Sequence, residues 1–149
     1  MESLEILPLG EEHLTEVAEI EALCFSEPWS REALSLLMRE GGMALVACLD
    51  GRVVAYGGMT YVLDEGSVTN IATHPDARRR GIGRRLTATM LERARSIGLC
   101  RVFLEVRESN LAARSLYEEL GFHACGVRKK IYRRPVESAI QMVWELDSL

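Results

Sequence analysis

Apolar residues recur along the first forty positions with two different periods, which mark one strand and two helices. Residues 4–9 form a short, largely apolar run that predicts a strand. Residues 11–25 predict a helix, because four apolar residues recur there at roughly helical spacing. A second helix is expected over residues 31–40, with Ser30 as its N-cap and Gly41-Gly42 as its stop. The apolar residues of the first helix are Leu14, Val17, Ala18 and Leu23.

The pattern then changes to apolar runs that are separated by turn residues. Asp50-Gly51 stands between residues 43–49 and residues 53–63. An Asp-Gly pair between two apolar runs is a strong signal for a hairpin. The segment 64–66 (Asp-Glu-Gly) predicts a second turn, which leads into residues 67–73. We therefore expect three consecutive antiparallel strands.

Helical periodicity returns in the second half of the chain. Apolar residues recur every three or four positions through residues 82–97, and Gly98 suits the C′ position of that helix. Residues 102–106 predict a short strand, and Asn110 can cap a last helix that ends near Leu120. The stripe of the first of these helices consists of Ile82, Leu86, Met90, Ala94 and Ile97.

Two further strands, at about 122–132 and 136–146, complete a single domain over residues 1–149. The strand–helix–strand unit of the second half predicts a right-handed crossover between parallel strands. The expected fold class is therefore α/β (α+β): a mixed, mostly antiparallel sheet of about seven strands, flanked by about four helices on both faces.

Composition narrows the function class. The net charge of −4 argues against a general nucleic-acid binder, so no direct nucleic-acid partner is expected. The N-terminal residues lack the basic start and apolar stretch of a signal peptide, and no apolar run is long enough to span a membrane. The four cysteines form no C-x-x-C pair and no zinc-type cluster, so no metal is expected. These features predict a cytoplasmic protein with reduced thiols.

The segment 78–85 concentrates positive charge in this acidic chain, between a predicted strand and a predicted helix. A helix start offers unpaired backbone N–H groups and a partial positive charge. Glycine lets a ligand approach that backbone closely, and arginine adds forked donors suited to phosphate. The segment predicts a pyrophosphate site rather than only a solvated helix face. It comprises Arg78, Arg79, Arg80, Gly81, Ile82, Gly83, Arg84 and Arg85.

Four motifs, in order, resemble the GNAT family of acetyl-CoA-dependent N-acetyltransferases, and within it the RimI-type N-terminal acetyltransferases. The resemblance covers nearly the whole chain and implies the GNAT fold. The matching segments are Phe25-x-x-Pro28-Trp29-Ser30, Asn70-Ile71-Ala72-Thr73-His74-Pro75 followed by Arg78-x-x-Gly81-x-Gly83, Leu104-Glu105-Val106-Arg107-x-Ser109-Asn110-x-x-Ala113, and Leu116-Tyr117-Glu118-x-Leu120-Gly121-Phe122.

The resemblance implies acetyl-CoA as cosubstrate and assigns residues to its parts. A bulged strand would pair its backbone with the pantetheine arm through Ile71, Ala72 and Thr73, because a bulge exposes backbone groups. Asn110 contacts coenzyme in the family, although here it can equally be only a helix cap. The pyrophosphate would be held by Gly81, Ile82, Gly83 and the neighbouring Arg78, Arg79, Arg80 and Arg84.

Glu105 and Tyr117 are the expected catalytic pair. Glu105 shares a strand face with Phe103, where partial burial would raise the pKa of its carboxyl toward that of a useful base; the alternative is an ion pair with Arg101 or Arg107. The matching family residue is the base, acting through water. Tyr117 lies on the apolar face of the last helix as a core aromatic, and its family counterpart protonates the departing thiolate.

The expected acceptor is the N-terminal α-amine of a protein, such as a small-subunit ribosomal protein, and the expected state is a monomer or weak dimer. Glu27, Trp29 and Tyr132 fall in segments that flank the acceptor groove in relatives. The segment 131–138 departs from the family by a shortened loop and by Ser138 in place of an acidic residue. A small-molecule N-acetyltransferase and a non-catalytic acetyl-CoA sensor therefore stay open. The basic run around Arg128 is a solvated hairpin by default, and a contact with ribosomal RNA is a weaker alternative.

Overall fold

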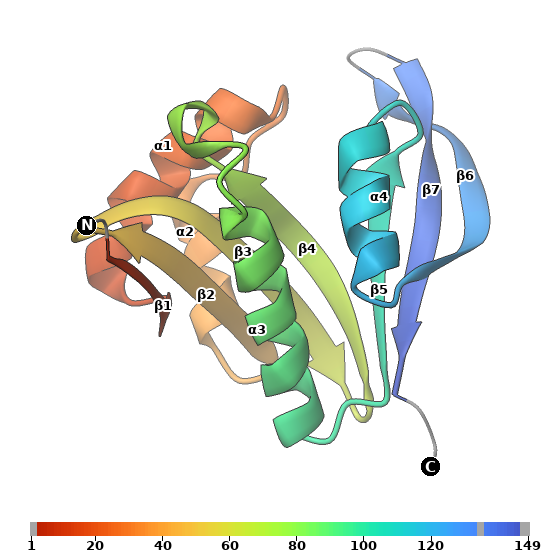
Figure 1. The fold of residues 1–149 in the computed structure, drawn as a ribbon, viewed down its shortest axis with the longest axis horizontal. Coiled ribbons are helices and arrows are strands. Elements are labelled where there is room, and N and C mark those ends of the chain that lie inside the picture. The colour runs from red at the N-terminus through yellow and green to blue at the C-terminus, as the bar shows by residue number, and fades with distance from the viewer. Residues whose placement is uncertain (1–2, 134–135, 147–149) are drawn as a thin grey trace.

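The computed structural model describes residues 3–133 and 136–146 (Figure 1). Seven strands and four α-helices are formed over this part of the chain, in the predicted order. The strands are β1 (Leu4–Pro8), β2 (Gly42–Leu49), β3 (Arg52–Val62), β4 (Glu65–Thr73), β5 (Arg101–Arg107), β6 (His123–Arg133) and β7 (Val136–Glu145). The helices are α1 (Leu14–Cys24), α2 (Arg31–Ser35), α3 (Ile82–Ser96) and α4 (Leu111–Glu119).

One sheet contains all these strands, in the order β1-β2-β3-β4-β5-β7-β6. Among the described strands, β4 and β5 are the one parallel pair, and they are joined only where Glu65–Ser67 pairs with Arg101–Phe103. Beyond that point the two strands diverge, as Figure 1 shows, with β4 on one side and β5 on the other. The mixed, mostly antiparallel sheet that the sequence predicted is confirmed.

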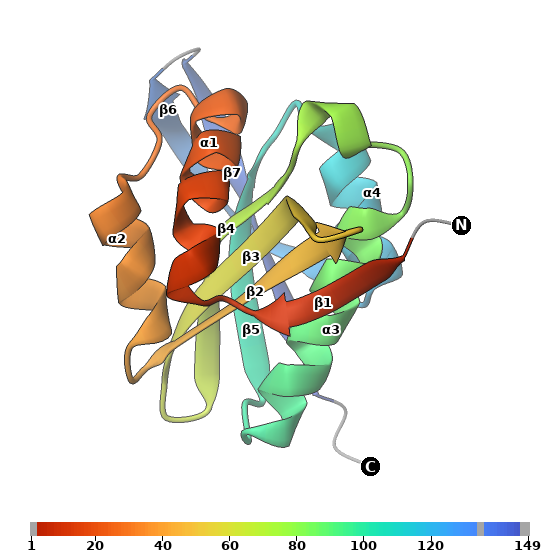
Figure 2. The same ribbon diagram turned by 90° about the vertical axis from the view of Figure 1, so that its left-hand side faces the viewer.

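Helices cover both faces of the sheet (Figure 2). On one face α1 and α2 pack through Leu14, Val17 and Leu34 against residues of β2 and β3 such as Val46. On the other face Leu86 and Met90 of α3 belong to a larger core. Alternation along β2 explains the division, because Val46 and Cys48 face the first core while Leu45 and Ala47 face the second. In the described part of the chain, no helix is both long and apolar enough to cross a membrane.

The turns and the cap of α2 form as the aspartate, glycine and serine positions indicate. Asp50 and Gly51 both have positive φ (50° and 85°), as a two-residue hairpin between β2 and β3 requires. Ser30 caps α2 by accepting a hydrogen bond from the N–H of Ala33. Gly98, at φ 91°, follows α3.

Four local expectations differ from the structure. The helical stripe of α1 buries Ile20 and Glu21, whereas Leu23 is 59% exposed. The second helix is shorter, since α2 continues only as the 3-10 turn Leu36–Met38. The second turn is tighter than predicted, because β4 already begins at Glu65. Ile97, expected in the stripe of α3, is exposed beyond the end of that helix.

Candidate active site

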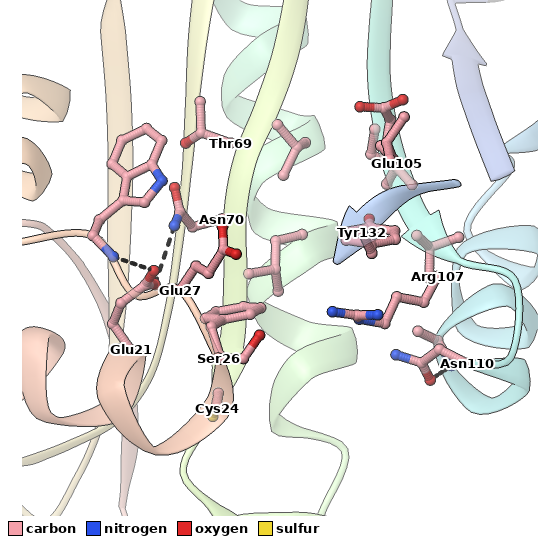
Figure 3. Close-up of a pocket in the computed structure, with 18 of the residues that line it drawn as sticks. Glu21, Cys24, Ser26, Glu27, Thr69, Asn70, Glu105, Arg107, Asn110 and Tyr132 are labelled. Carbon is pink, nitrogen blue, oxygen red and sulfur yellow. Dashed lines mark hydrogen bonds between the residues drawn. The ribbon is translucent and has the colours of Figure 1, made fainter. Parts of the chain in front are cut away.

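A pocket of about 600 Å³ opens where β4 and β5 diverge. The end of α1 and the segment that follows it form one wall, and β4 forms the floor beside them. The opposite wall comes from β5, α4 and β6 (Figure 3). Figure 3 shows Glu21, Ser26 and Glu27 on the first side and Glu105, Arg107 and Tyr132 on the other. The divergence of two strands therefore creates the space into which these polar side chains point.

The start of α3 forms an open cradle near this pocket. Its N-cap, Gly81, has φ 74° and no side chain that could occupy the N–H groups of the first turn. A Cβ atom placed on Gly81 would meet nothing within 4 Å, so the space beside this N-cap residue is open. An open helix N-terminus with arginines beside it fits a pyrophosphate.

The backbone of β4 has a bulge at Thr69, just ahead of the residues 71–73 that the family resemblance assigned to the pantetheine arm. The register with β3 shifts between Gly58 and Met59, so that Thr69 is the extra residue, and its hydroxyl donates to the carbonyl of Gly58. The predicted contacts Ile71, Ala72 and Thr73 follow the bulge. Since β5 pairs only with Glu65–Ser67 of β4, the edge of these residues that faces β5 has no partner among the described strands. Such an edge can pair with an extended arm such as pantetheine.

The arginines of the segment 78–84 do not all face one point. The Nε of Arg78 donates to the carbonyl of Thr73 at 3.3 Å, and its Nη2 lies 3.4 Å from the Sγ of Cys24. Arg84 makes an ion pair with Glu119 of α4. Arg79 has a positive φ of 65°, and it is exposed together with Arg80. Arg78 is therefore tied to the end of β4, whereas Arg84 bridges α3 and α4.

Glu105 lies on the β5 wall of the pocket, with its side chain 31% exposed. Its Oε1 accepts a hydrogen bond from the Nη1 of Arg128 at 2.9 Å. Neither expected partner contacts it in this way: Arg101 pairs with Glu65 and Glu145, and Arg107 pairs with Glu137. The strand order explains the difference, because Arg128 of β6 reaches across β7 to β5.

Tyr117 also lines the pocket, from α4, and its side chain is buried. Its ring packs edge-to-face against Phe122, with the centroids 5.7 Å apart. Burial, with a smaller contribution from Tyr132, raises the pKa of the Tyr117 hydroxyl to about 12. The hydroxyl therefore keeps its proton at any physiological pH and can only be a donor to a neighbouring anion. The core position and the donor role are compatible.

Asn110 is the N-cap of α4 and also lines the pocket, so the helix-cap reading and a contact with the coenzyme are compatible. Its Oδ1 accepts a hydrogen bond from the N–H of Ala113 at 3.2 Å, which makes it the N-cap of α4. Its side chain is also part of the pocket lining (Figure 3). The amide can thus cap the helix through its oxygen and present its nitrogen to a ligand.

The β6 wall is shaped by β7. The register between these strands shifts between Arg128 and Tyr132, and the N–H of Lys130 in that bulge donates to the hydroxyl of Ser138 at 3.0 Å. Ile131 and Tyr132 follow the bulge and line the pocket. Ser138 thus holds this bulge. Arg134 and Pro135, in the loop that was expected to be shortened, lie outside the described residues.

Sequence reasoning missed Glu21. This residue of α1 is 1% exposed, lines the pocket, and accepts hydrogen bonds from the N–H of Trp29, the amide of Asn70 and the hydroxyl of Tyr56. Desolvation by burial is the main reason that the pKa of its carboxyl is raised above 4.5. A signal was present: Glu21 lies seven residues after Leu14 on the apolar stripe, where a carboxylate is unexpected.

Comparisons with known proteins identify the family of this chain. Residues 14–122 match the model of the acetyltransferase (GNAT) family. The ribosomal protein bS18-alanine N-acetyltransferase of Salmonella typhimurium is 37% identical over 114 residues, which are 76% of this chain and 77% of that protein. Its Escherichia coli K12 counterpart is 34% identical over 113 residues, 76% of each chain. A crystal structure of the ribosomal-protein-S18-alanine N-acetyltransferase from Escherichia coli gives a TM-score of 0.89 at 30% identity, over 100% of this chain and 96% of that chain. The chain therefore belongs to the GNAT family of acetyltransferases.

Proposed function

We propose that this protein transfers an acetyl group from acetyl-CoA to the N-terminal α-amine of a protein. The acceptor suggested by the names of its relatives is ribosomal protein bS18, with alanine as the acetylated residue. The observation that carries the proposal is the pocket between β4 and β5, which brings Glu105 and Tyr117 together beside the open start of α3.

In the proposed mechanism, bound acetyl-CoA supplies the thioester carbonyl that the amine attacks. The open N-terminus of α3 and the neighbouring Arg78, Arg79 and Arg80 would hold the pyrophosphate, and the free edge of β4 at Ile71–Thr73 would orient the pantetheine arm. Glu105 takes the proton from the α-ammonium, directly or through water. An α-amino group has a pKa of about 7.7–8.0, so a modest base is sufficient. As the C–N bond forms and the C–S bond breaks, the Tyr117 hydroxyl would donate its proton to the departing sulfur. The nitrogen loses its second proton as the amide forms, and that proton would restore the Tyr117 hydroxyl through solvent.

Charge at the acceptor side supports a cationic substrate. Glu27 and Glu105 face the pocket from its two sides (Figure 3), whereas the cationic Arg107 is paired with Glu137. Arg128, part of the basic run, is engaged with Glu105. We therefore propose a protein N-terminus as the partner. As the sequence indicated, we also propose no direct nucleic-acid partner, a cytoplasmic location and a monomer or weak dimer.

The test is acetyl-CoA turnover, followed by thiol release, on short peptides with different N-terminal residues and on free polyamines and amino acids. Peptides that start with alanine are expected to be the best acceptors. Glu105→Gln is expected to lower kcat by a factor of about 10²–10⁴, which is typical for a lost proton-transfer group. Glu108→Gln, an exposed change three residues away, is the matched control. Turnover of free amines alone contradicts the proposal in favour of a small-molecule enzyme; acetyl-CoA binding without turnover favours a sensor.

A further inference from the structure

One buried carboxyl group connects three elements beside the pocket. Glu21 projects from α1 with its side chain 1% exposed. Its Oε2 accepts a hydrogen bond from the N–H of Trp29 at 2.9 Å. Its Oε1 accepts from the Nδ2 of Asn70 on β4 at 3.1 Å and from the hydroxyl of Tyr56 on β3. The segment after α1 is thereby tied to two central strands of the sheet.

A carboxyl group at this buried position on an apolar helix face is unfavourable for stability. Burial disfavours the ionised form, and a well-packed apolar side chain in the same stripe would usually be as stable or more stable. A buried charged residue that departs from the apolar pattern of its helix face is expected at a functional site. The position of Glu21 is therefore better explained by what the carboxyl holds than by stability.

What it holds is one wall of the pocket. The segment 24–29 contributes Cys24, Phe25, Ser26, Glu27 and Trp29 to the lining, and Asn70 contributes from the strand residue after the bulge at Thr69. Figure 3 shows Glu21 between this segment and Asn70, with a hydrogen bond to the amide. The Oδ1 of Asn70 is buried without a partner in the described structure, so the bond to Glu21 is what orients that side chain.

We propose that Glu21 is a positioning residue for the acceptor: it fixes the segment 24–29 against β3 and β4, and so sets the width of the pocket on the side opposite Glu105. The hydrogen bonds that Glu21 accepts come from Trp29, Tyr56 and Asn70, so we expect a larger effect on acceptor binding than on coenzyme binding. This proposal rests on the proposed function.

The first test compares the KM for the peptide acceptor with the KM for acetyl-CoA. Glu21→Ala is expected to raise the KM for an alanine-starting peptide at least tenfold, while the KM for acetyl-CoA stays within twofold of the wild-type value. Glu21→Gln, which keeps an oxygen for the N–H of Trp29, is expected to restore most of the peptide affinity. Should Glu21→Ala not fold, Tyr56→Phe removes one partner of the same carboxyl and is expected to raise the peptide KM selectively. Equal changes in both KM values, or an unchanged peptide KM, would overturn the proposal.

Glu16→Ala is the matched control. Glu16 lies on the same helix, and its Oε2 accepts a hydrogen bond from the N–H of Val53 on β3 at 3.0 Å. It also ties α1 to the sheet, but it does not line the pocket. The control is therefore expected to weaken the helix–sheet contact and leave the peptide KM unchanged. A KM change as large as that of Glu21→Ala would mean that any loosening of α1 has this effect, which also overturns the proposal.

A second readout needs no turnover. The chain has two tryptophans, so Trp144→Phe leaves Trp29 as the only one. In that background Glu21→Ala is expected to increase quenching of Trp29 fluorescence by acrylamide, because the segment loses its anchor, whereas Glu16→Ala is expected not to. If the wild-type protein acetylates no peptide, the proposed function fails, while this measurement still decides whether Glu21 anchors the wall. If Glu21→Ala leaves the quenching of Trp29 unchanged, Glu21 does not anchor the segment 24–29.

Discussion

The guanidinium of Arg107 lies over the ring of Tyr132, with its central carbon 4.1 Å from the ring centroid. Arg107 ends β5 and Tyr132 belongs to β6, and β7 runs between these strands. Glu137 of β7 accepts a hydrogen bond from the Nη1 of Arg107 at 3.2 Å, and it also accepts from the N–H and hydroxyl of Ser109. The stack thus completes the pocket wall that faces the segment held by Glu21.

Removing the ring of Tyr132 is expected to weaken acceptor binding. A cation–π contact at an accessible site contributes about 0.5–1 kcal/mol, so Tyr132→Leu should raise the peptide KM about two- to fivefold. Tyr132→Phe keeps the ring and is the control. Steady-state kinetics with saturating acetyl-CoA give both values. If the phenylalanine variant loses as much affinity as the leucine variant, the hydroxyl rather than the stack is responsible.

The pKa of Tyr117 leads to a prediction about pH. Because burial raises that pKa to about 12, the hydroxyl stays protonated below this value and cannot be the source of a kinetic limb between pH 6 and pH 10. Tyr117→Phe should therefore lower kcat by the same factor at pH 7 and at pH 10. Full pH profiles of the two proteins provide the comparison. If the ratio of the wild-type kcat to the Tyr117→Phe kcat becomes smaller as the pH rises from 7 to 10, Tyr117 ionises in this range.

Substitution of Gly81 should act on the coenzyme. At φ 74° a β-branched residue is strained, so Gly81→Val should reorient the first turn of α3 and raise the Kd for acetyl-CoA. Isothermal titration measures that Kd directly. Gly51→Val is a matched control, since Gly51 has φ 85° and open space around it, but lies in the hairpin between β2 and β3. Gly51→Val should lose stability without a change in the Kd for acetyl-CoA. If both variants lose the same affinity for acetyl-CoA, the start of α3 is not the specific binding site for the pyrophosphate.

Elements and their order could be read from the sequence because each depends on local periodicity and turn chemistry. The stripe of α3, the hairpin at Asp50-Gly51 and the cap of α4 at Asn110 need no knowledge of distant residues. The catalytic pair could be named because its motifs are continuous segments. Their roles remain predictions that the proposed variants test.

Long-range relationships could not be read in this way. Arg128 pairs with Glu105 because β6 lies beyond β7 in the sheet, an order that periodicity along the chain does not specify. The bulge at Thr69 depends on the register with β3. The partners of Glu21 come from Trp29, Tyr56 and Asn70, up to 49 residues away in sequence. These three features depend on how distant segments pack together. The local pattern of apolar and polar residues indicated only one of them, through the carboxylate of Glu21 on an apolar helix face.

The buried carboxyl of Glu21 should make stability depend on pH in a defined direction. Its folded-state pKa is raised above 4.5, chiefly by burial, so the folded protein binds this proton more tightly than the unfolded chain does. The resulting stabilisation is fully present below pH 4.5 and is lost as the pH rises through the folded-state pKa. The hydroxyl of Tyr56 can accept as well as donate, so its contact survives protonation. Glu21→Gln cannot ionise and should escape this loss.

Urea unfolding at several pH values between 4 and 8 measures the effect. The free energy of unfolding of Glu21→Gln, minus that of the wild-type protein, should become more positive as the pH rises above 4.5. Other titrating groups are common to both proteins and largely cancel in this difference. A difference that is flat with pH would mean that Glu21 has the same pKa in both states. A difference that falls with rising pH would mean that its hydrogen bonds outweigh burial and favour the ionised carboxylate.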